Sequence, residues 1–179
     1  MSVFEGASGL CYHGKAVEIN VVIDGEFQSL LEVGWLQDVA GVVLAAEGTD
    51  PSMELGLVIT SQEKMRELNA THLGRDEPTD VLSFSMLPEA ASGREEDVDV
   101  PAFVAPPDGA VHLGEVIVSY PQAVIQAEEH GHPVSKEVAI LVVHGVLHLL
   151  GYDHDVPEPE RRMRAREMEI TKRIEEKGL

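Results

Sequence analysis

Cysteine is nearly absent from this sequence, since Cys11 is the only one in 179 residues. One cysteine excludes an internal disulfide and a thiolate-rich metal site, and it fits a reducing compartment. Long apolar runs are also missing, because no segment approaches the roughly 20 apolar residues of a membrane span. The N-terminus has no basic start followed by an apolar stretch, so no secretory signal is expected. These absences predict a cytoplasmic protein that does not use a membrane.

Basic residues are scarce, with 13 Lys and Arg against 32 Asp and Glu, for a net charge of −19. This balance argues against indiscriminate nucleic-acid binding through a broadly basic surface. The basic residues gather between positions 161 and 177, whereas positions 89–108 are acidic apart from Arg94. Such a charged run is usually a solvated helix face, here with acidic partners such as Glu167; phosphate contact is the weaker interpretation.

The length and the apolar pattern predict one α+β domain, residues 1–179, that can fold without a metal or disulfide. The predicted strands are Ala16–Ile23, Met53–Ile59, Val81–Phe84 and Val111–Val118. The predicted helices are Phe27–Ala46, Thr60 to about Thr71 with a Thr60–Glu63 capping box, Ser119–His130 ended by Gly131, a metal-bearing helix started by Pro133 and Ser135, and a last helix from about Glu160. We expect a mixed four-stranded sheet with helices mainly on one face and a zincin-like metal helix.

One stretch of the chain does not fit this regular pattern. Residues Pro88 to Gly109 are rich in Pro, Asp, Glu and Ala and contain few large apolar groups. Such a composition cannot bury enough apolar surface to order itself. We therefore expect a mobile acidic insertion at 88–109, in the connection between the last two strands.

The run His144-Gly-Val-Leu-His148-Leu-Leu-Gly151-Tyr-Asp-His154 carries the chemistry. Helical spacing places His144 and His148 one turn apart on one face. Gly151 allows the chain to turn back and bring His154 to the same point. Imidazole is a good zinc ligand, and three protein ligands leave a fourth position for water. We predict that these three histidines bind one divalent metal ion, Zn²⁺ by preference.

Two other interpretations of the run remain open. His144 and His148 can be hydrogen-bonded core histidines with His154 in a turn. The spacing also matches the zinc-binding helix and turn of metzincin proteases. Those enzymes need a glutamate directly after the first histidine as general base, and Gly145 has no side chain to accept a proton. Peptide hydrolysis by that route is therefore not expected.

The run resembles the signature of the YbeY family, bacterial single-strand endoribonucleases that carry a metal ion on three histidines. The resemblance extends upstream through Leu68-Asn69, Pro78-Thr-Asp-Val-Leu-Ser-Phe84 and Gly114-Glu-Val-Ile-Val-Ser119, and covers most of residues 16–168. It implies hydrolysis of RNA phosphodiester bonds, maturation of the 16S rRNA 3′ end and a role in ribosome quality control. The implied partners are rRNA, ribosomal particles, and a ribosomal protein or assembly GTPase.

The resemblance also suggests residues around the metal. Many family members have an arginine that aligns here with Leu73, and Arg75 is the candidate to replace it as a phosphate contact. Thr79, Asp80 and Ser83 are implied to line or buttress the pocket as substrate-binding residues. For Thr79 and Asp80 a turn-and-strand role explains the sequence almost as well.

Metal-bound water is the expected nucleophile, with Arg75 and Asp153 as the candidate catalytic side chains. Asp153 and Asp155 are equally explained as surface turn residues. We treat four other histidines, His72, His112, His130 and His132, as non-ligands. Met163 and Met168 are expected in the core of an amphipathic helix.

The sequence leaves two rival functions open. One is a ribosome assembly factor whose metal site is mainly structural, which the high negative charge favours because bare RNA is repelled at long range. The other is a metallohydrolase that acts on a different substrate.

Overall fold

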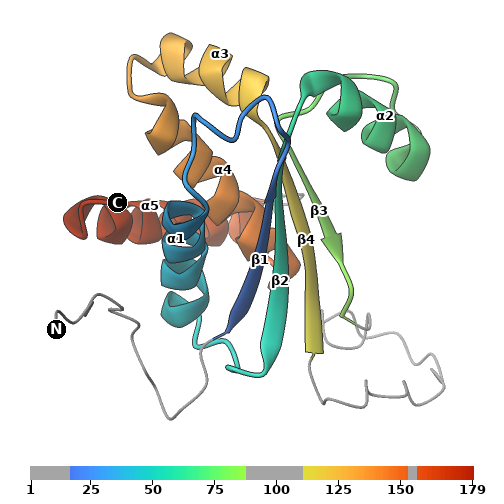
Figure 1. Ribbon diagram of the computed structural model, residues 1–179. Helices are drawn as coiled ribbons and strands as arrows, with labels where there is room; N and C mark the ends of the chain where they lie inside the picture. Colours follow the sequence, from blue (N-terminus) through green and yellow to red (C-terminus); the bar gives the residue numbers. More distant parts are fainter. Residues whose placement is uncertain (1–16, 88–110, 153–156) are drawn as a thin grey trace, which may run out of the picture.

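The computed structural model describes residues 17–87, 111–152 and 157–179 (Figure 1). The acidic insertion predicted at 88–109 lies outside these residues. The elements are β1 (Glu18–Ile23), α1 (Val33–Ala46), β2 (Met53–Thr60), α2 (Gln62–Leu73), β3 (Val81–Ser85), β4 (Val111–Ser119), α3 (Tyr120–His130), α4 (Val134–Leu149) and α5 (Pro157–Glu176). Their order is the one predicted from the sequence.

The four strands form one mixed sheet in the order β1-β2-β4-β3. β1 pairs in parallel with β2, and β2 pairs in parallel with β4. β3 runs antiparallel to β4 at the opposite edge, with Ser83 facing Val116 in the register. The predicted fold class, α+β with a mixed four-stranded sheet, is confirmed.

Helices cover both faces of the sheet unequally (Figure 1). On one face α1, α4 and α5 enclose the main core, in which Leu36, Leu57 and Leu147 are fully buried. On the other face α2 covers a smaller cluster that includes Met65 and Ile117. Alternate residues of β3 and β4 point to opposite faces of the sheet and therefore belong to two different cores. Helix α3 adds Ala123 to this main core, and α4 contacts α1, α3 and α5 as well as the sheet.

The first helix begins later than the apolar pattern predicts. Residues 25–30 form turns, and α1 begins at Val33 rather than at Phe27. The N–H of Phe27 donates to the carbonyl of Asp24 at 2.8 Å, and the N–H of Leu30 donates to the carbonyl of Phe27 at 2.9 Å. The buried Phe27 ring lies against Tyr120, with centroids 5.1 Å apart. A tertiary aromatic contact thus replaces the expected helical turn.

The predicted capping box of the second helix is also wrong by one residue. Ser61 caps α2 by accepting a hydrogen bond from the N–H of Lys64 at 3.3 Å. The hydroxyl of Thr60 is fully buried and donates instead to Oδ2 of Asp24 at 2.5 Å. Because Thr60 has a tertiary partner, the next hydroxyl residue satisfies the end of the helix.

The last helix starts at Pro157 and not near Glu160. Proline lacks a backbone N–H but fits the first turn of a helix, where that group has no helical partner. Met163 is buried as predicted, whereas Met168 is 69% exposed, so its assignment to the core is wrong. None of the helices within the described residues is both long and apolar enough to span a membrane.

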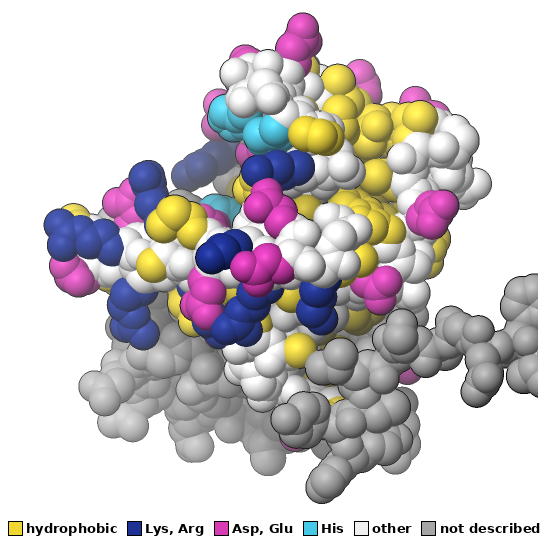
Figure 2. Space-filling view, turned by 90° about the vertical axis from the view of Figure 1, so that its left-hand side faces the viewer, with side chains coloured by type: hydrophobic (Ala, Val, Ile, Leu, Met, Phe, Trp, Pro, Cys, Tyr) yellow, Lys and Arg dark blue, Asp and Glu magenta, His cyan; other side chains and the backbone are white. Residues whose placement is uncertain are grey.

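The basic residues of α5 lie in a mixed charge pattern (Figure 2). Figure 2 shows Lys and Arg side chains interleaved with Asp and Glu on this face. The pairs within the helix are Arg161–Glu158, Arg164–Glu160, Arg166–Glu169, Lys172–Glu176 and Arg173–Glu169. These contacts support the interpretation of a solvated helix face with internal partners.

Candidate metal centre

His144 and His148 direct ring nitrogens toward each other from the C-terminal half of α4. The aliphatic residues around them, Val143, Val146 and Leu147, are fully buried and fix this part of the helix. The two Nε2 atoms lie 3.1 Å apart, and the ring planes are nearly perpendicular at 72°. Neighbouring nitrogens of a tetrahedral zinc site lie about 3.3 Å apart, given bonds of about 2.0–2.1 Å. The two histidines therefore fit one metal ion.

Helix α5 brings a carboxylate to this pair. Nδ1 of His144 lies 2.5 Å from Oε1 of Glu167. A carboxylate only accepts hydrogen bonds, so Nδ1 carries the proton and donates it, and Nε2 keeps its lone pair. This is the tautomer that a metal ligand bound through Nε2 requires. From the sequence Glu167 is seen only as a charge partner, because no local signal links positions 23 residues apart.

Gly145 lies where α4 meets the sheet most closely. A β-carbon at this position would be 2.5 Å from Cγ1 of Val116 and 3.2 Å from the hydroxyl of Ser83. That hydroxyl donates to the carbonyl of Gly145 at 3.0 Å. A glutamate has no room here, which gives a steric reason for the absence of the metzincin base. Ser83 contacts the backbone of the metal-bearing helix next to His144.

The chain turns back after α4 at Gly151, whose φ of 90° favours glycine. Tyr152 follows and donates from its hydroxyl to Oε2 of Glu47 at 2.9 Å. Burial and this hydrogen bond raise the pKa of Tyr152. His154 and Asp153 lie outside the described residues, so the third ligand and the candidate carboxylate stay predictions.

A half-buried arginine fixes α5 beside the turn. Arg166 donates to Oε1 of Glu47 at 2.5 Å, to Oε2 of Glu169 at 2.6 Å and to the carbonyl of Ala46 at 2.5 Å. The two carboxylates raise the pKa of Arg166 above its ordinary value. Because Glu167 is the next residue, these bonds also fix the helix that presents Glu167 to the histidines.

His144 of the histidine pair lines a hollow at the surface. It is lined by His144, Glu160, Met163, Arg164 and Glu167. Nη2 of Arg164 pairs with Oε1 of Glu160 at 2.7 Å, and the Arg164 side chain is 72% exposed. The hollow thus places His144, one of the predicted metal ligands, near a cationic side chain that solutes can reach.

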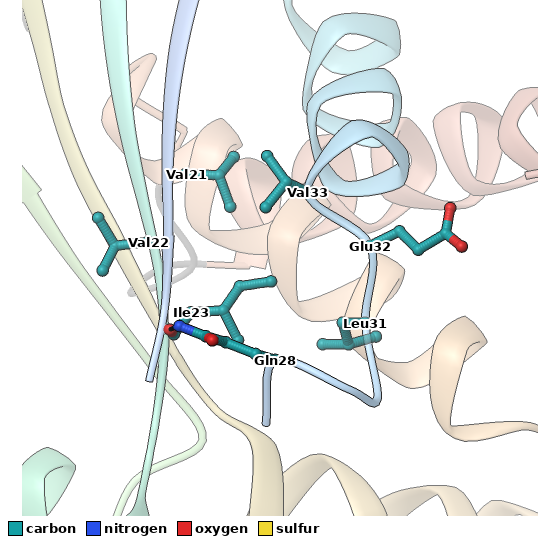
Figure 3. Close-up of a pocket in the computed structure, with 7 residues that line it drawn as sticks. All are labelled: Val21, Val22, Ile23, Gln28, Leu31, Glu32 and Val33. Carbon is teal, nitrogen blue, oxygen red and sulfur yellow. Dashed lines mark hydrogen bonds between the residues drawn. The ribbon is translucent and has the colours of Figure 1, made fainter. Parts of the chain in front are cut away.

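A second hollow lies between β1 and the segment that leads into α1 (Figure 3). Its lining is mainly aliphatic, with Val21, Leu31 and Val33 around it. The Gln28 amide donates to the carbonyl of Ile23 at 3.2 Å. Figure 3 shows no imidazole or thiol among the residues drawn, so the histidine site is the better candidate for hydrolytic chemistry.

The predicted substrate-binding residues lie in different settings. Arg75 is exposed in the loop after α2, where its N–H donates to the carbonyl of Asn69 at 3.3 Å. The carboxylate of Asp80 accepts from the N–H of Val81 at 2.8 Å and from the amide of Gln126 at 2.9 Å. These contacts support the turn-and-strand interpretation of Asp80.

The hydroxyl of Thr79 lies 3.4 Å from both Oδ1 of Asp80 and the carbonyl of Val81. Ser83, in contrast, reaches α4 as described above. Through its hydrogen bond to the carbonyl of Gly145, Ser83 thus contacts the metal-bearing helix directly.

The structure also brings together three residues that the sequence did not connect. His130, His132 and Glu137 have ligand atoms that all lie within 4.8 Å of one another, and within the described residues they form a group able to hold a metal ion. From the sequence His130 and His132 are non-ligands, because neither has a second ligand at helical spacing. Glu137 reaches them only because the chain turns between α3 and α4.

A protein-family model described as endoribonuclease YbeY matches residues 25–175. The chain belongs to the YbeY family. Its resemblance to that family in sequence is thereby confirmed. The match spans all elements from α1 to α5, including the paired histidines of α4.

Relatives named endoribonuclease YbeY cover most of this chain. The YbeY protein of Dehalococcoides mccartyi strain BAV1 is 48% identical over 160 residues, which are 89% of this chain and 98% of that protein. YbeY of Moorella thermoacetica is 44% identical over 135 residues, 75% of this chain and 81% of that protein. The solution structure of a Thermotoga maritima protein matches with a TM-score of 0.56 at 25% identity, over 87% of this chain and 88% of that chain.

Proposed function

We propose that this protein is a metal-dependent, single-strand-specific endoribonuclease in maturation of the 16S rRNA 3′ end and in ribosome quality control. Relatives up to 48% identical over most of the chain are named endoribonuclease YbeY. Membership of this family makes RNA hydrolysis the reaction. The proposed setting is the cytoplasm, with rRNA in ribosomal particles as the substrate and a ribosomal protein or assembly GTPase as the docking partner.

One observation supports metal dependence above the others. The Nε2 atoms of His144 and His148 lie 3.1 Å apart, and Glu167 holds the proton of His144 on the opposite ring nitrogen. We propose that His144, His148 and His154 bind one divalent ion, Zn²⁺. His154 is included as the third ligand because of its position in the sequence run.

The groups around this centre have distinct roles in the proposed reaction. When bound, the ion supplies a Lewis acid for the phosphoryl oxygens and an acidified water molecule. Glu167 keeps His144 in the ligand tautomer and orients its ring. Arg164, at the edge of the hollow, offers a positive charge to a phosphate, and Arg75 is a second candidate for such a contact.

The assembly-factor alternative rests on charge. The net charge of −19 repels free RNA at long range, and the basic residues of α5 are largely paired with glutamates of the same helix. A ribosomal protein would then provide the main docking surface. In that case the metal centre has a structural role and the purified protein does not cut RNA.

A cleavage assay separates the two functions. Purified protein is incubated with a single-stranded 16S precursor and with the same sequence in a duplex, before and after metal removal by a chelator. We expect cleavage of the single strand alone, loss of cleavage with chelator, and recovery when zinc is added back. Absence of cleavage together with copurification of ribosomal particles would support the assembly factor.

A further inference from the structure

The turn between α3 and α4 brings two imidazoles onto one buried carboxylate. Oε2 of Glu137 lies 3.0 Å from Nε2 of His132 and 3.3 Å from Nδ1 of His130. The side chain of Glu137 is 5% exposed, that of His132 is 18% exposed, and that of His130 is 59% exposed. The group thus has a buried carboxylate, that of Glu137, and an imidazole that faces solvent, that of His130. Figure 2 shows histidine side chains at the surface near the top of this view.

The hydrogen bonds of His132 point to a cation in this group. Nδ1 of His132 lies 3.2 Å from the carbonyl oxygen of Pro133, which can only accept, so Nδ1 carries a proton. Nε2 then faces a carboxylate oxygen of Glu137 at 3.0 Å. A lone pair and a carboxylate oxygen this close need a proton or a metal ion between them, and a metal ion would take both atoms as ligands.

The distances from the carboxylate oxygen to the two imidazole nitrogens suit a metal ion. The distances of 3.0 and 3.3 Å are close to the value of about 3.3 Å between neighbouring ligands of a tetrahedral zinc ion. A His₂Glu set is a usual donor combination for zinc. The exposed side of His130 leaves the fourth position open to solvent.

The backbone holds the ligands in place without a metal. Gly131 adopts a left-handed φ of 68° that ends α3, and the N–H of His132 donates to the carbonyl of Ala127 at 3.1 Å. The carbonyl of Pro133 accepts from the N–H of Glu137 at 3.3 Å in the first turn of α4. The two histidines and Glu137 are therefore fixed by the end of one helix and the start of the next.

We propose that His130, His132 and Glu137 form a second divalent-cation site of the zinc type, which joins the end of α3 to the start of α4. It is separate from the paired histidines, because Glu137 and His144 are seven residues apart, about 10 Å along the helix axis. The site does not depend on the proposed nuclease function. Its ion stabilises the N-terminal end of the metal-bearing helix.

Zinc stoichiometry tests this site directly. Protein stripped of metal is titrated with zinc chloride, and bound zinc is counted by elemental analysis after gel filtration. We expect two zinc ions per chain in the wild type, one in His132→Ala, one in His148→Ala and none in the double variant. His112→Ala is the matched control, since His112 is an exposed histidine whose Nδ1 pairs with Glu54; this variant should keep two ions.

His130→Ala provides a second variant that removes only an exposed side chain. Circular dichroism checks that each variant is folded. Loss of one zinc ion in His130→Ala and His132→Ala supports the site. Retention of two ions in both folded variants, or a wild type that binds one ion and loses it in His148→Ala, would overturn it. If the three-histidine centre does not bind zinc, His148→Ala binds as many zinc ions as the wild type. This result distinguishes a failure of that centre from a failure of the second site.

Discussion

Gly145 shows what a single missing side chain does at the metal centre. From the sequence, Gly145 explains the lack of a protease base; the structure adds that a β-carbon would lie 2.5 Å from Cγ1 of Val116. The same contact lets the Ser83 hydroxyl reach the backbone of α4. The close approach of helix and sheet could not be predicted, because it depends on residues some 30 and 60 positions away.

Gly145→Ala should destabilise the protein by about 1–3 kcal/mol, the usual cost of overpacking a well-packed core. Urea denaturation measures this difference. Gly34→Ala is the control, since a β-carbon there meets nothing within 4 Å and alanine favours the helix by roughly 0.5–1 kcal/mol. Equal stability of Gly145→Ala and wild type would show that the helix can move away from the sheet.

Glu167→Ala should weaken zinc binding at the three-histidine centre by about 10- to 100-fold, because the hydrogen bond that orients His144 is lost. Glu167→Gln, which can still accept from Nδ1, should have a smaller effect. Competition with a chromogenic chelator measures the zinc affinity. The variants are made in a His132→Ala background, so that the three-histidine centre is the one that is titrated.

Glu176→Gln removes an exposed carboxylate of the same helix and serves as the control for Glu167. It should leave zinc affinity unchanged. Equal affinities for Glu167→Ala and wild type would contradict a role of Glu167 in positioning the ligand.

At the scale of elements, α5 is attached to the rest of the molecule through Arg166. This side chain is 22% exposed and contacts Glu47 at the end of α1, while Tyr152 reaches the same carboxylate. The apolar pattern predicts a helix here. It does not reveal that one of its arginines is half-buried, since all the arginines of this run look alike in the sequence.

Arg166→Ala should reduce the free energy of unfolding by about 1.5–3 kcal/mol, because it leaves the Glu47 carboxylate, which is only 13% exposed, without its charged donor. Thermal and urea denaturation measure the loss. Arg161→Ala, at a side chain that is 75% exposed, should change stability by no more than about 0.5 kcal/mol. Similar losses in both variants would mean that Arg166 acts only as a surface charge.

Element boundaries could be predicted where local signals decide them. Ser119 caps α3 and Gly131 ends it, as the sequence predicts, because both features depend on neighbouring residues. The starts of α1 and α2 could not be predicted, because both are changed by contacts of Asp24, Thr60 and Phe27 with distant parts of the chain. Tertiary partners override local propensity at these positions.

At the scale of the whole molecule, the core is built from apolar side chains, and we expect it to form without a metal ion. Apolar residues fill both sides of the sheet, and the larger cluster extends through α1, α4 and α5. The mixed sheet and this layer of helices follow from the element order and could be predicted. The group of His130, His132 and Glu137 could not, because it forms only when two helices meet at a turn.

Metal removal should therefore lower the melting temperature while leaving the protein folded. Ligand linkage predicts a stabilisation of about 2.7 kcal/mol for an ion present at 100 times its dissociation constant, which is lost with a chelator. Far-UV circular dichroism and a thermal melt provide the measurement. Loss of a cooperative melt in the chelated protein would show that the fold requires the metal.

The central claim is that the histidine pair of α4 holds the ion used for RNA cleavage. The most direct test compares His148→Ala with His112→Ala in one experiment that measures zinc content and the cleavage rate of single-stranded 16S precursor. We predict that His148→Ala loses one zinc ion and all cleavage, whereas His112→Ala keeps both at wild-type levels. Cleavage at the wild-type rate by a His148→Ala protein that has lost this zinc would contradict the claim.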